Sequence, residues 1–348
     1  MIELLKKAVA MGGSDIFIIP GACATVKVNS TLQNLTEDKL LPPDTERLVR
    51  EMYELAHRDV ALLDREGDDD FSFALLNVSR FRCNAYRQRG TMAAICRIVN
   101  FELPDARAMN IPDLVMELAA QRSGMILVTG PAGSGKSTTL ACMVDRINAT
   151  RSAHIVTIED PIEYLHRHQK SLVSQREVPN DAATFSRALR AALRQAPDVI
   201  MLGEMRDLDT IRTAITAAET GHLLLSSLHT IGAAKTVDRI IDTFPAEQQA
   251  QIRVQLSMVL KAVVSQRLVP TVDDKRVAVF EVMTVTPAIQ NMIRDGRTHQ
   301  IDNVIYGGSD RNMISMDGEL QRLVRQGVIT REMAILYAAN PETLAKRI

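Results

Sequence analysis

A glycine-rich segment near the middle of the chain fits the pattern GxxxxGK[ST]. The apolar run 125–129 precedes it, and Leu140, Met143 and Val144 recur at helical spacing behind it. A strand, a tight loop and a helix in this order are typical of a βα unit, so the segment predicts an α/β fold. The segment and the residue after it are Gly130, Pro131, Ala132, Gly133, Ser134, Gly135, Lys136, Ser137 and Thr138.

This segment has the chemistry of a phosphate-binding loop. Glycines let backbone N–H groups converge on phosphate oxygens, and the helix behind the loop adds the positive end of its dipole. Lys136 is expected to reach the β- and γ-phosphates of a nucleotide, and the Ser137 hydroxyl is expected to ligate Mg²⁺. The alternative is a chance glycine-rich turn, which the flanking strand and helix disfavour. The chain has no NKxD-type guanine selector, which favours ATP.

Length and charge exclude several classes of protein. The 348 residues are enough for two or three domains, and 46% apolar and 24% charged residues are typical of a globular chain. Lys and Arg number 41 against 42 Asp and Glu, so no basic excess indicates binding to nucleic acid. No apolar run approaches the roughly 18 residues of a membrane span. The short run 16–19 ends at Pro20 and predicts a strand rather than a signal peptide.

The cysteines are few and scattered. They are Cys23, Cys83, Cys96 and Cys142, and no two of them form a CxxC pair. This usage predicts a cytoplasmic protein with reduced cysteines and without a zinc site.

The first hundred residues have the pattern of a small α+β domain. Apolar spacing predicts helices near 4–9 and after Pro43. Strands are predicted at 15–19 and 25–28. The acidic run 64–70 is interpreted as a solvated loop.

A β-hairpin is predicted at the end of this region. Polar and apolar residues alternate from position 80 to 86, which places Arg80 and Arg82 on one face of the first strand. The turn is expected near 88–91, before a return strand at 92–99.

The pattern changes at about residue 100. Pro104 and Pro112 lie between two well-patterned regions, in a stretch that is typical of an interdomain linker. We therefore predict an N-terminal domain at 1–100, a linker at 101–112 and a second domain at 113–348.

In the second domain, apolar strands alternate with long helical stretches, as in a mostly parallel sheet. After about Ala246 the pattern is almost wholly helical, apart from a short strand pair around 276–283. Thr286-Pro287 predicts the start of a helix. The predicted strands are 125–129, 154–158, 199–202 and 223–228.

Polar residues follow three of these strands. Glu159 and Glu163 follow the second strand, Glu204 follows the third and His229 follows the fourth. In open α/β sheets, ligands bind outside the carboxyl ends of the strands. A metal–nucleotide site needs one carboxylate near Mg²⁺ and another that orients or deprotonates water, and the three glutamates are the candidates.

Each of these residues also has a structural interpretation. Glu159 could belong to a solvated turn, because Asp160-Pro161 follows it. Glu204 could be an acid in the first turn of a helix. His222 and His229 could be core histidines with satisfied hydrogen bonds. The shared position after apolar strands favours a site.

Several segments together resemble the four motifs of the type II/type IV secretion superfamily of hexameric ATPases. VTGPAGSGKSTT resembles the Walker A motif, IVTIEDPIEY the Asp box, and TAAETGHLLLSSLHT the His box. SQREV and ALRAALRQAPDVIMLGEMRD resemble the stretch that leads to the Walker B motif. The likeness covers nearly the whole chain and is strongest to the type IV pilus retraction (twitching motility) ATPases. It implies a RecA-like P-loop NTPase domain with a smaller N-terminal α+β (PAS-like) domain.

The resemblance also implies roles for single residues. Glu163 is implied to activate the attacking water, and Glu204 to hold Mg²⁺, partly through water, together with Ser137. Glu159 is expected beside the nucleotide. His222 and His229 are implied to couple the γ-phosphate to their surroundings.

Members of this family also direct arginines of the N-terminal domain toward the phosphates. By their place in the hairpin, Arg82 and Arg97 match best, and Arg80 is a weaker candidate. The alternative for these arginines is an exposed hairpin face.

Two features favour the retraction type within the superfamily. Pilus assembly and type II secretion ATPases commonly carry a four-cysteine metal insert, whereas this chain has no cysteine after Cys142. Retraction ATPases carry a C-terminal helix motif near AIRxxIRE, and residues 288–295 read AIQNMIRD. Gln290 and Asp295 depart from that motif.

The resemblance implies a cytoplasmic homo-hexamer, peripheral at the inner face of the cytoplasmic membrane. It would use Mg-ATP hydrolysis to drive pilus retraction through an inner-membrane platform protein, and other pilus ATPases are possible partners. The alternatives are a pilus assembly or type II secretion ATPase and a weakly active accessory ring subunit. A RecA-like nucleic-acid motor shares the core, but the neutral charge disfavours it.

Overall fold

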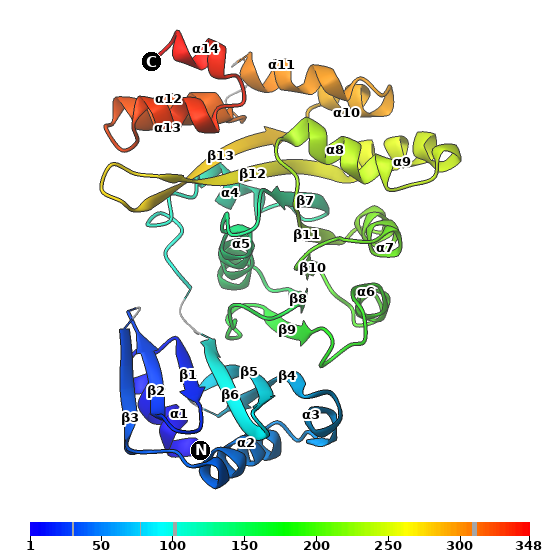
Figure 1. Ribbon diagram of the computed structural model, residues 1–348. Coiled ribbons are helices and arrows are strands. Elements are labelled where there is room, and N and C mark those ends of the chain that lie inside the picture. The colour runs from blue at the N-terminus through cyan, green and yellow to red at the C-terminus, as the bar shows by residue number, and fades with distance from the viewer. Residues whose placement is uncertain (30, 77, 100–102, 308–311) are drawn as a thin grey trace. The chain divides into compact units, whose positions relative to one another are not determined.

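The computed structural model describes residues 1–29, 31–76, 78–99, 103–307 and 312–348 (Figure 1). Its contacts divide the chain into two compact units. The first comprises Met1–Glu102 and Glu163–Leu165, and the second comprises Leu103–Ile162 and His166–Ile348. The predicted boundary between N-terminal domain and linker falls on residues 100–102, which lie outside the described residues, so the domain limits stay a prediction.

In the described part of the first unit, the elements are α1 (Ile2–Ala10), β1 (Asp15–Ile18), β2 (Cys23–Val28), β3 (Thr31–Lys39), α2 (Pro42–Leu55), α3 (Ala61–Glu66), β4 (Asp68–Leu75), β5 (Ser79–Gln88) and β6 (Thr91–Val99). The strands form a six-stranded antiparallel sheet in the order β3-β2-β1-β6-β5-β4. The predicted hairpin is confirmed as β5 and β6, and buried residues alternate along β5. Pro42 and Pro43 open α2, where a missing N–H costs nothing.

The acidic run 64–70 is mostly exposed, as predicted, but it is not a loop. It spans the end of α3, a turn and the start of β4. Buried Asp69 accepts hydrogen bonds from Arg58 Nε at 2.9 Å and Arg58 Nη2 at 2.7 Å, and from the Tyr53 hydroxyl at 3.0 Å. A bidentate arginine pair of this kind allows a carboxylate to be buried.

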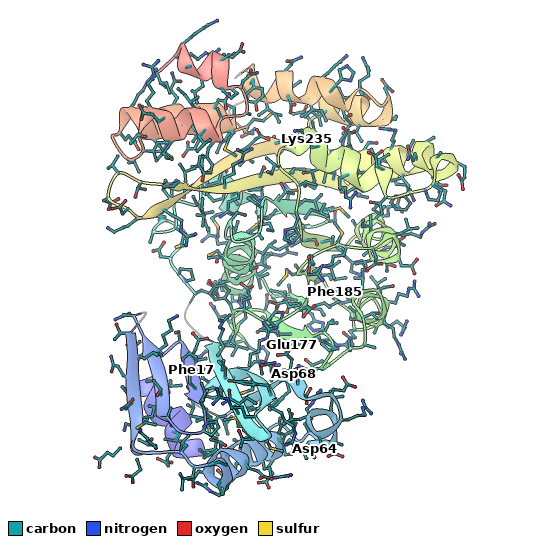
Figure 2. All side chains as sticks on the ribbon, in the orientation of Figure 1. Phe17, Asp64, Asp68, Glu177, Phe185 and Lys235 are labelled. Carbon is teal, nitrogen blue, oxygen red and sulfur yellow. A yellow bond between two sulfur atoms is a disulfide. The ribbon has the colours of Figure 1, made fainter. Side chains whose placement is uncertain are left out.

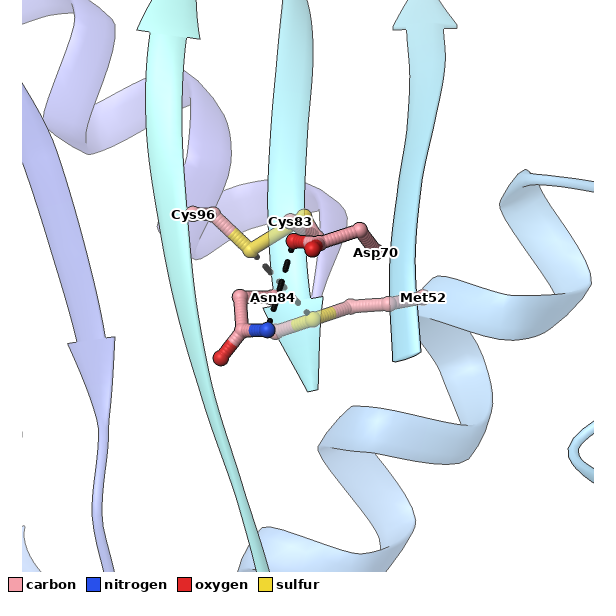
Figure 3. The surroundings of a disulfide bond; sticks show 5 residues. All are labelled: Met52, Asp70, Cys83, Asn84 and Cys96. Carbon is pink, nitrogen blue, oxygen red and sulfur yellow. Dashed lines mark hydrogen bonds between the residues drawn. A yellow bond between two sulfur atoms is a disulfide. The ribbon is translucent and has the colours of Figure 1, made fainter. Parts of the chain in front are cut away.

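Cys83 and Cys96 form a disulfide between β5 and β6 (Figure 3). They are direct partners in the ladder, with Cα atoms 4.2 Å apart, as in a non-hydrogen-bonded pair. The prediction of reduced cysteines was therefore wrong for this pair, because spacing alone does not reveal hairpin register. Cys23 and Cys142 are free, and burial raises the pKa of the Cys142 thiol to about 11.

The second unit is built on a seven-stranded sheet. Its first elements are α4 (Asp113–Leu118), β7 (Gly124–Thr129), α5 (Lys136–Thr150), β8 (His154–Glu159), β9 (Leu172–Glu177), α6 (Phe185–Ala192), β10 (Val199–Leu202), α7 (Leu208–Glu219), β11 (Leu223–Leu228), α8 (Ala233–Asp242), α9 (Ala246–Val259), β12 (Leu260–Pro270) and β13 (Arg276–Thr284). The strand order is β13-β12-β7-β11-β10-β8-β9, and all pairs are parallel except β12 with β13. The four predicted strands are confirmed as β7, β8, β10 and β11.

Helices cover both faces of this sheet (Figure 1). Helices α6 to α9 pack on one face, against residues such as Leu127 and Ile158, and Phe185 of α6 joins this core (Figure 2). Helices α4 and α5 pack on the other face, against Ile126 and Val128. Successive residues of β7 therefore enter two cores, as expected for a central parallel strand.

The chain after Ala246 is less helical than predicted. Residues Leu260–Pro270 form β12, which pairs with β7 on one side and β13 on the other. Residues 262–266 of β12 are buried without interruption, on both faces of the strand, so this part of the sequence carries neither helical nor strand periodicity. Strand β9 was also not predicted.

Helices complete the chain after β13: α10 (Pro287–Arg294), the 3₁₀-helix η1 (Thr298–Gln300), α11 (Ile301–Tyr306), α12 (Met316–Arg325), α13 (Arg331–Tyr337) and α14 (Pro341–Ala345). Helix α10 begins where predicted, with the Thr286 hydroxyl accepting the N–H of Ile289 at 3.4 Å. Within the described ranges, no helix has the length and apolar character that crossing a membrane requires.

Candidate functional site

The carboxyl ends of four neighbouring strands bring the predicted site residues to one edge of the sheet. The glycine-rich loop follows β7, His229 follows β11, Glu204 lies just beyond β10, and Glu159 ends β8. Since these strands are parallel and adjacent in the order β7-β11-β10-β8, the four groups lie in sequence along that edge. This is the place where open α/β sheets bind ligands.

Glycines are required in the loop for two different reasons. At Gly130 a Cβ atom would lie 2.2 Å from the backbone oxygen of Gln266, and the φ of +148° is one that other residues rarely adopt. Gly135, with φ +89°, is the N-cap of α5, so the first N–H groups of that helix face the loop. The loop therefore has the shape and donors of an anion-binding turn.

Lys136 is the cation of this loop, and its side chain is buried. Its Nζ donates to the backbone oxygens of Gly130 at 3.0 Å and Pro131 at 2.9 Å. The residue is only 7% exposed, so the ammonium is held beside the loop rather than in solvent. Phosphate oxygens are stronger acceptors than these two carbonyl oxygens, so the ammonium can exchange them for a bound phosphate.

His229 links this lysine to Glu204. Its Nδ1 lies 3.5 Å from Lys136 Nζ, and its Nε2 lies 3.3 Å from Glu204 Oε2. An ammonium can only donate, so Nδ1 is the acceptor in the contact with Lys136, while Nε2 faces the carboxylate of Glu204. The His229 ring therefore lies between Lys136 and Glu204 and contacts both.

Glu204 is buried and lies beside Arg206 and His229. Arg206 Nη2 forms an ion pair with its Oε1, and this hydrogen bond raises the pKa of the arginine. Its Oε2 is shielded from solvent and, among the described residues, has no hydrogen bond of good geometry. An under-satisfied buried carboxylate oxygen fits a role in binding a hydrated Mg²⁺.

Ser137 and Glu204 fit the predicted magnesium site by donor type. Ser137 is exposed at the start of α5, and hard oxygen donors such as its hydroxyl and a carboxylate suit Mg²⁺. Across the described ranges, no three His, Cys, Asp or Glu side chains group as a metal-binding cluster.

Glu159 and Glu163 have different surroundings. Glu159 is buried at the end of β8, where its Oε1 accepts from Thr157 Oγ1 at 2.6 Å and Gln175 Nε2 at 3.2 Å. It is therefore not part of a solvated turn. Glu163 is exposed and lies in the segment grouped with the first unit.

The two histidines lie at opposite ends of β11. His222 precedes the strand and His229 follows it, so they are roughly 20 Å apart at about 3.3 Å per strand residue. The Nδ1 of His222 lies 2.9 Å from the backbone oxygen of Ala217 and 3.1 Å from Thr220 Oγ1. The structure therefore does not bring His222 to the phosphate loop of its own chain.

The predicted arginines belong to the first unit. Arg82 on β5 and Arg97 on β6 are direct cross-strand partners. Arg97 donates from Nε to Asp15 Oδ1 at 2.9 Å, and 68% of its side chain is exposed. The pair forms a local positive patch on the hairpin.

Gln266 lies against the phosphate loop, and motif matching did not identify it. It is 3% exposed on β12, its Oε1 accepts from Thr139 Oγ1 at 2.7 Å, and a Cβ at Gly135 would lie 2.9 Å from its Nε2. The side chain therefore supports the start of α5 from a strand more than a hundred residues away. Arg206 was likewise not predicted, although it directly follows the strand-end motif.

A phosphate-binding loop with a buried lysine, a carboxylate and a histidine on neighbouring strand ends defines a nucleotide-binding ATPase of the P-loop class. Residues 108–327 match the family described as type II/IV secretion system protein, and the chain belongs to this family.

Relatives extend the match over the whole chain. The chain is 42% identical over 342 residues to the "Type IV pilus retractation ATPase PilT" of Pseudomonas aeruginosa, covering 98% of each protein. It is 39% identical over 344 residues to the "Type IV pilus ATPase PilU" of the same organism, covering 98% of this chain and 89% of that protein.

A solved structure agrees with these relatives. A crystal structure of the pilus retraction motor PilT with bound ADP superposes with a TM-score of 0.89 at 43% identity, covering 100% of this chain and 99% of that one. The predicted resemblance to pilus retraction ATPases is confirmed. The predicted fold class, a RecA-like P-loop NTPase domain with a smaller N-terminal α+β (PAS-like) domain, is also confirmed.

Proposed function

We propose that this chain is a homo-hexameric ATPase that uses Mg-ATP hydrolysis to drive type IV pilus retraction. The observation that carries the proposal is the row formed by Lys136, His229 and Glu204 at the carboxyl edge of the sheet. Sequence identity to a pilus retraction ATPase over nearly the full chain supports the same conclusion.

At the proposed site, residues of the second unit hold the nucleotide. The loop N–H groups and Lys136 bind the phosphates, while Ser137 and Glu204 hold Mg²⁺, which neutralises charge that develops on the transferred phosphoryl group. Thr138 and Glu159 are the other residues that we assign to nucleotide binding. His229 lies between the lysine and the carboxylate and responds to the loss of the γ-phosphate.

The remaining groups are a candidate base and two candidate arginines. Glu163 orients and deprotonates water, and Arg82 and Arg97 stabilise phosphate charge on a neighbouring subunit. We assign 1–100 to an N-terminal domain, 101–112 to a linker and 113–348 to the ATPase domain. His222 lies at the opposite end of β11 from the phosphate loop, so it does not contact the nucleotide of its own chain. Any part that it has in coupling therefore involves residues other than those of this loop.

The proposed ring is cytoplasmic and peripheral at the inner face of the cytoplasmic membrane. Its partners are an inner-membrane pilus platform protein and, where present, other pilus ATPases; nucleic acid is not a partner. The alternative is an accessory ring subunit of low activity, and the chain also resembles a protein named only as a pilus ATPase, PilU. Turnover of the purified chain alone separates the two.

Lys136→Ala is expected to abolish nucleotide binding, because the loop loses the buried cation that meets the phosphates. Anisotropy of a fluorescent ATP analogue measures this. Lys170→Ala, which removes an exposed lysine of the same unit, should bind like the wild type. Tight binding by Lys136→Ala would mean that the loop does not hold the phosphates.

Arg294→Ala is expected to abolish pilus retraction in a host whose own gene is deleted, while ATP turnover and ring formation stay within a few-fold of wild type. Arg294 is exposed at the end of α10, whose buried face is formed by Ile289 and Ile293, so it has no packing role. Gln290→Arg should be neutral or mildly improving.

Arg297→Ala is the matched control, because Arg297 is also exposed and pairs locally with Asp295. Loss of ATPase activity in Arg294→Ala would show that α10 belongs to the catalytic fold. Normal retraction in that variant would show that α10 has no part in force output.

A further inference from the structure

The loop that carries His229 is anchored by two side chains of the β12–β13 hairpin. Three residues after His229, the N–H of Gly232 donates to Ser265 Oγ at 3.0 Å. The next N–H, of Ala233, donates to Glu281 Oε1 at 3.1 Å. Ser265 and Glu281 are direct cross-strand partners on β12 and β13, so two adjacent acceptors meet two consecutive donors.

We propose that Ser265 and Glu281 are positioning residues for ATP hydrolysis, which hold His229 in register with Lys136 and Glu204 and transmit its movement to the C-terminal helices. We call the two residues the hairpin clamp. The inference rests on the proposed role of His229 at the γ-phosphate.

Helix α8 needs this clamp because it has no cap of its own. Its N-cap is Gly232, at φ +90°, and no side chain of the N-cap accepts a hydrogen bond. The first N–H groups of a helix require acceptors, and a carboxylate there also interacts favourably with the helix dipole. In α8 that acceptor comes from β13, so the start of the helix is bonded to the hairpin.

Burying a carboxylate at position 281 costs free energy. Glu281 is 3% exposed, and burial raises the pKa of its carboxyl group. An apolar residue would pack there without that cost, whereas a carboxylate supplies two oxygens for two separate bonds. Its Oε2 accepts from the Tyr306 hydroxyl at 3.4 Å, so the same side chain contacts α8 and α11.

A second bond joins α8 to the C-terminal helices. Thr298 Oγ1, in η1, donates to Asp238 Oδ1 on α8 at 2.7 Å. Helix α8 is therefore attached at its start through Glu281 to α11 and along its length to η1, which leads out of α10. A shift of the His229 loop moves the start of α8 and, with it, the helices proposed to deliver force.

Two measurements test the clamp. Hydrogen exchange of the peptide covering 230–236 reads the bonds directly, without any need for turnover. Glu281→Ala and Ser265→Ala should each raise exchange there about 10-fold, the effect of losing roughly one buried hydrogen bond. Ser257→Ala, which removes another buried serine hydroxyl that bonds only to a local backbone oxygen, should leave this peptide unchanged.

Steady-state kinetics then test positioning. Glu281→Ala should lower kcat about 10-fold with KM for ATP within a few-fold, because the loop and Lys136 are intact. Glu281→Gln should restore most of kcat, since its amide oxygen still accepts from Ala233. If Glu281→Ala does not fold, kcat and KM of Ser265→Ala are compared with those of the wild type instead.

Unchanged exchange at 230–236 in both alanine variants would overturn the clamp. Raised exchange in Glu281→Ala with wild-type kcat would overturn the role of the clamp in positioning. A rise in KM as large as the fall in kcat, or an equal loss of kcat in Glu281→Gln, would also overturn it. A wild-type chain that binds nucleotide but does not hydrolyse it would contradict the proposed function, while the exchange experiment would still decide on the clamp.

Discussion

Glu163→Gln is expected to lower ATP turnover by roughly 10²–10⁴-fold, the usual worth of a general base, while nucleotide binding is retained. The amide keeps the size of the side chain but cannot take a proton from water. Glu163 is exposed, so water reaches its carboxylate, and no residue of the phosphate loop changes. Turnover and fluorescent-nucleotide binding of the same preparation measure the two effects separately.

Glu159→Gln is the matched comparison. Glu159 is a buried carboxylate whose Oε1 already accepts two hydrogen bonds, which suits a supporting role better than proton transfer. We expect this variant to lose less activity than Glu163→Gln. Turnover within a few-fold of wild type for Glu163→Gln, together with a large loss for Glu159→Gln, would show that the base is misassigned.

The second large effect concerns the arginines of the hairpin. Arg82→Ala is expected to reduce turnover by roughly 10³–10⁵-fold, because an arginine that meets the transferred phosphoryl group from another subunit stabilises its charge. Arg97→Ala is tested in the same way. Arg87→Ala is the control, since Arg87 lies on the same strand but is exposed and pairs with Asp64.

A mixing experiment tests whether the site is shared between subunits. Arg82→Ala and Glu163→Gln subunits are each inactive alone, yet together they should regain some activity, because one type of interface then holds both intact residues. Mixed rings are verified by mass before the assay. Mixed rings that form without any recovery would count against a shared site for Arg82, and Arg97 would then be examined.

Much of the nucleotide site could be predicted because its signals are local. The strand, loop and helix around Lys136 are contiguous, and each strand end that carries Glu204 or His229 directly follows an apolar run. Parallel pairing then brings those ends to one edge, a consequence of topology that the βα alternation already implied. The hairpin and the start of α10 followed from periodicity and from Thr286-Pro287 in the same way.

The features that were missed depend on partners remote in sequence. Asp69 is buried because Arg58 and Tyr53 meet it, and the Cys83–Cys96 pairing depends on hairpin register. Strand β12 carries no period because both of its faces are covered. Gln266 and Glu281 act on loops that lie far from them along the chain, and no motif records such contacts.

The most direct test of the account is Mg²⁺-dependent ATP turnover of the purified chain, measured against protein concentration alongside the mass of the particles in solution. The account predicts hydrolysis that requires Mg²⁺, is absent from Lys136→Ala, and has a specific activity that rises as rings assemble. Hydrolysis of constant specific activity by monomers, or no hydrolysis by assembled rings, would contradict it.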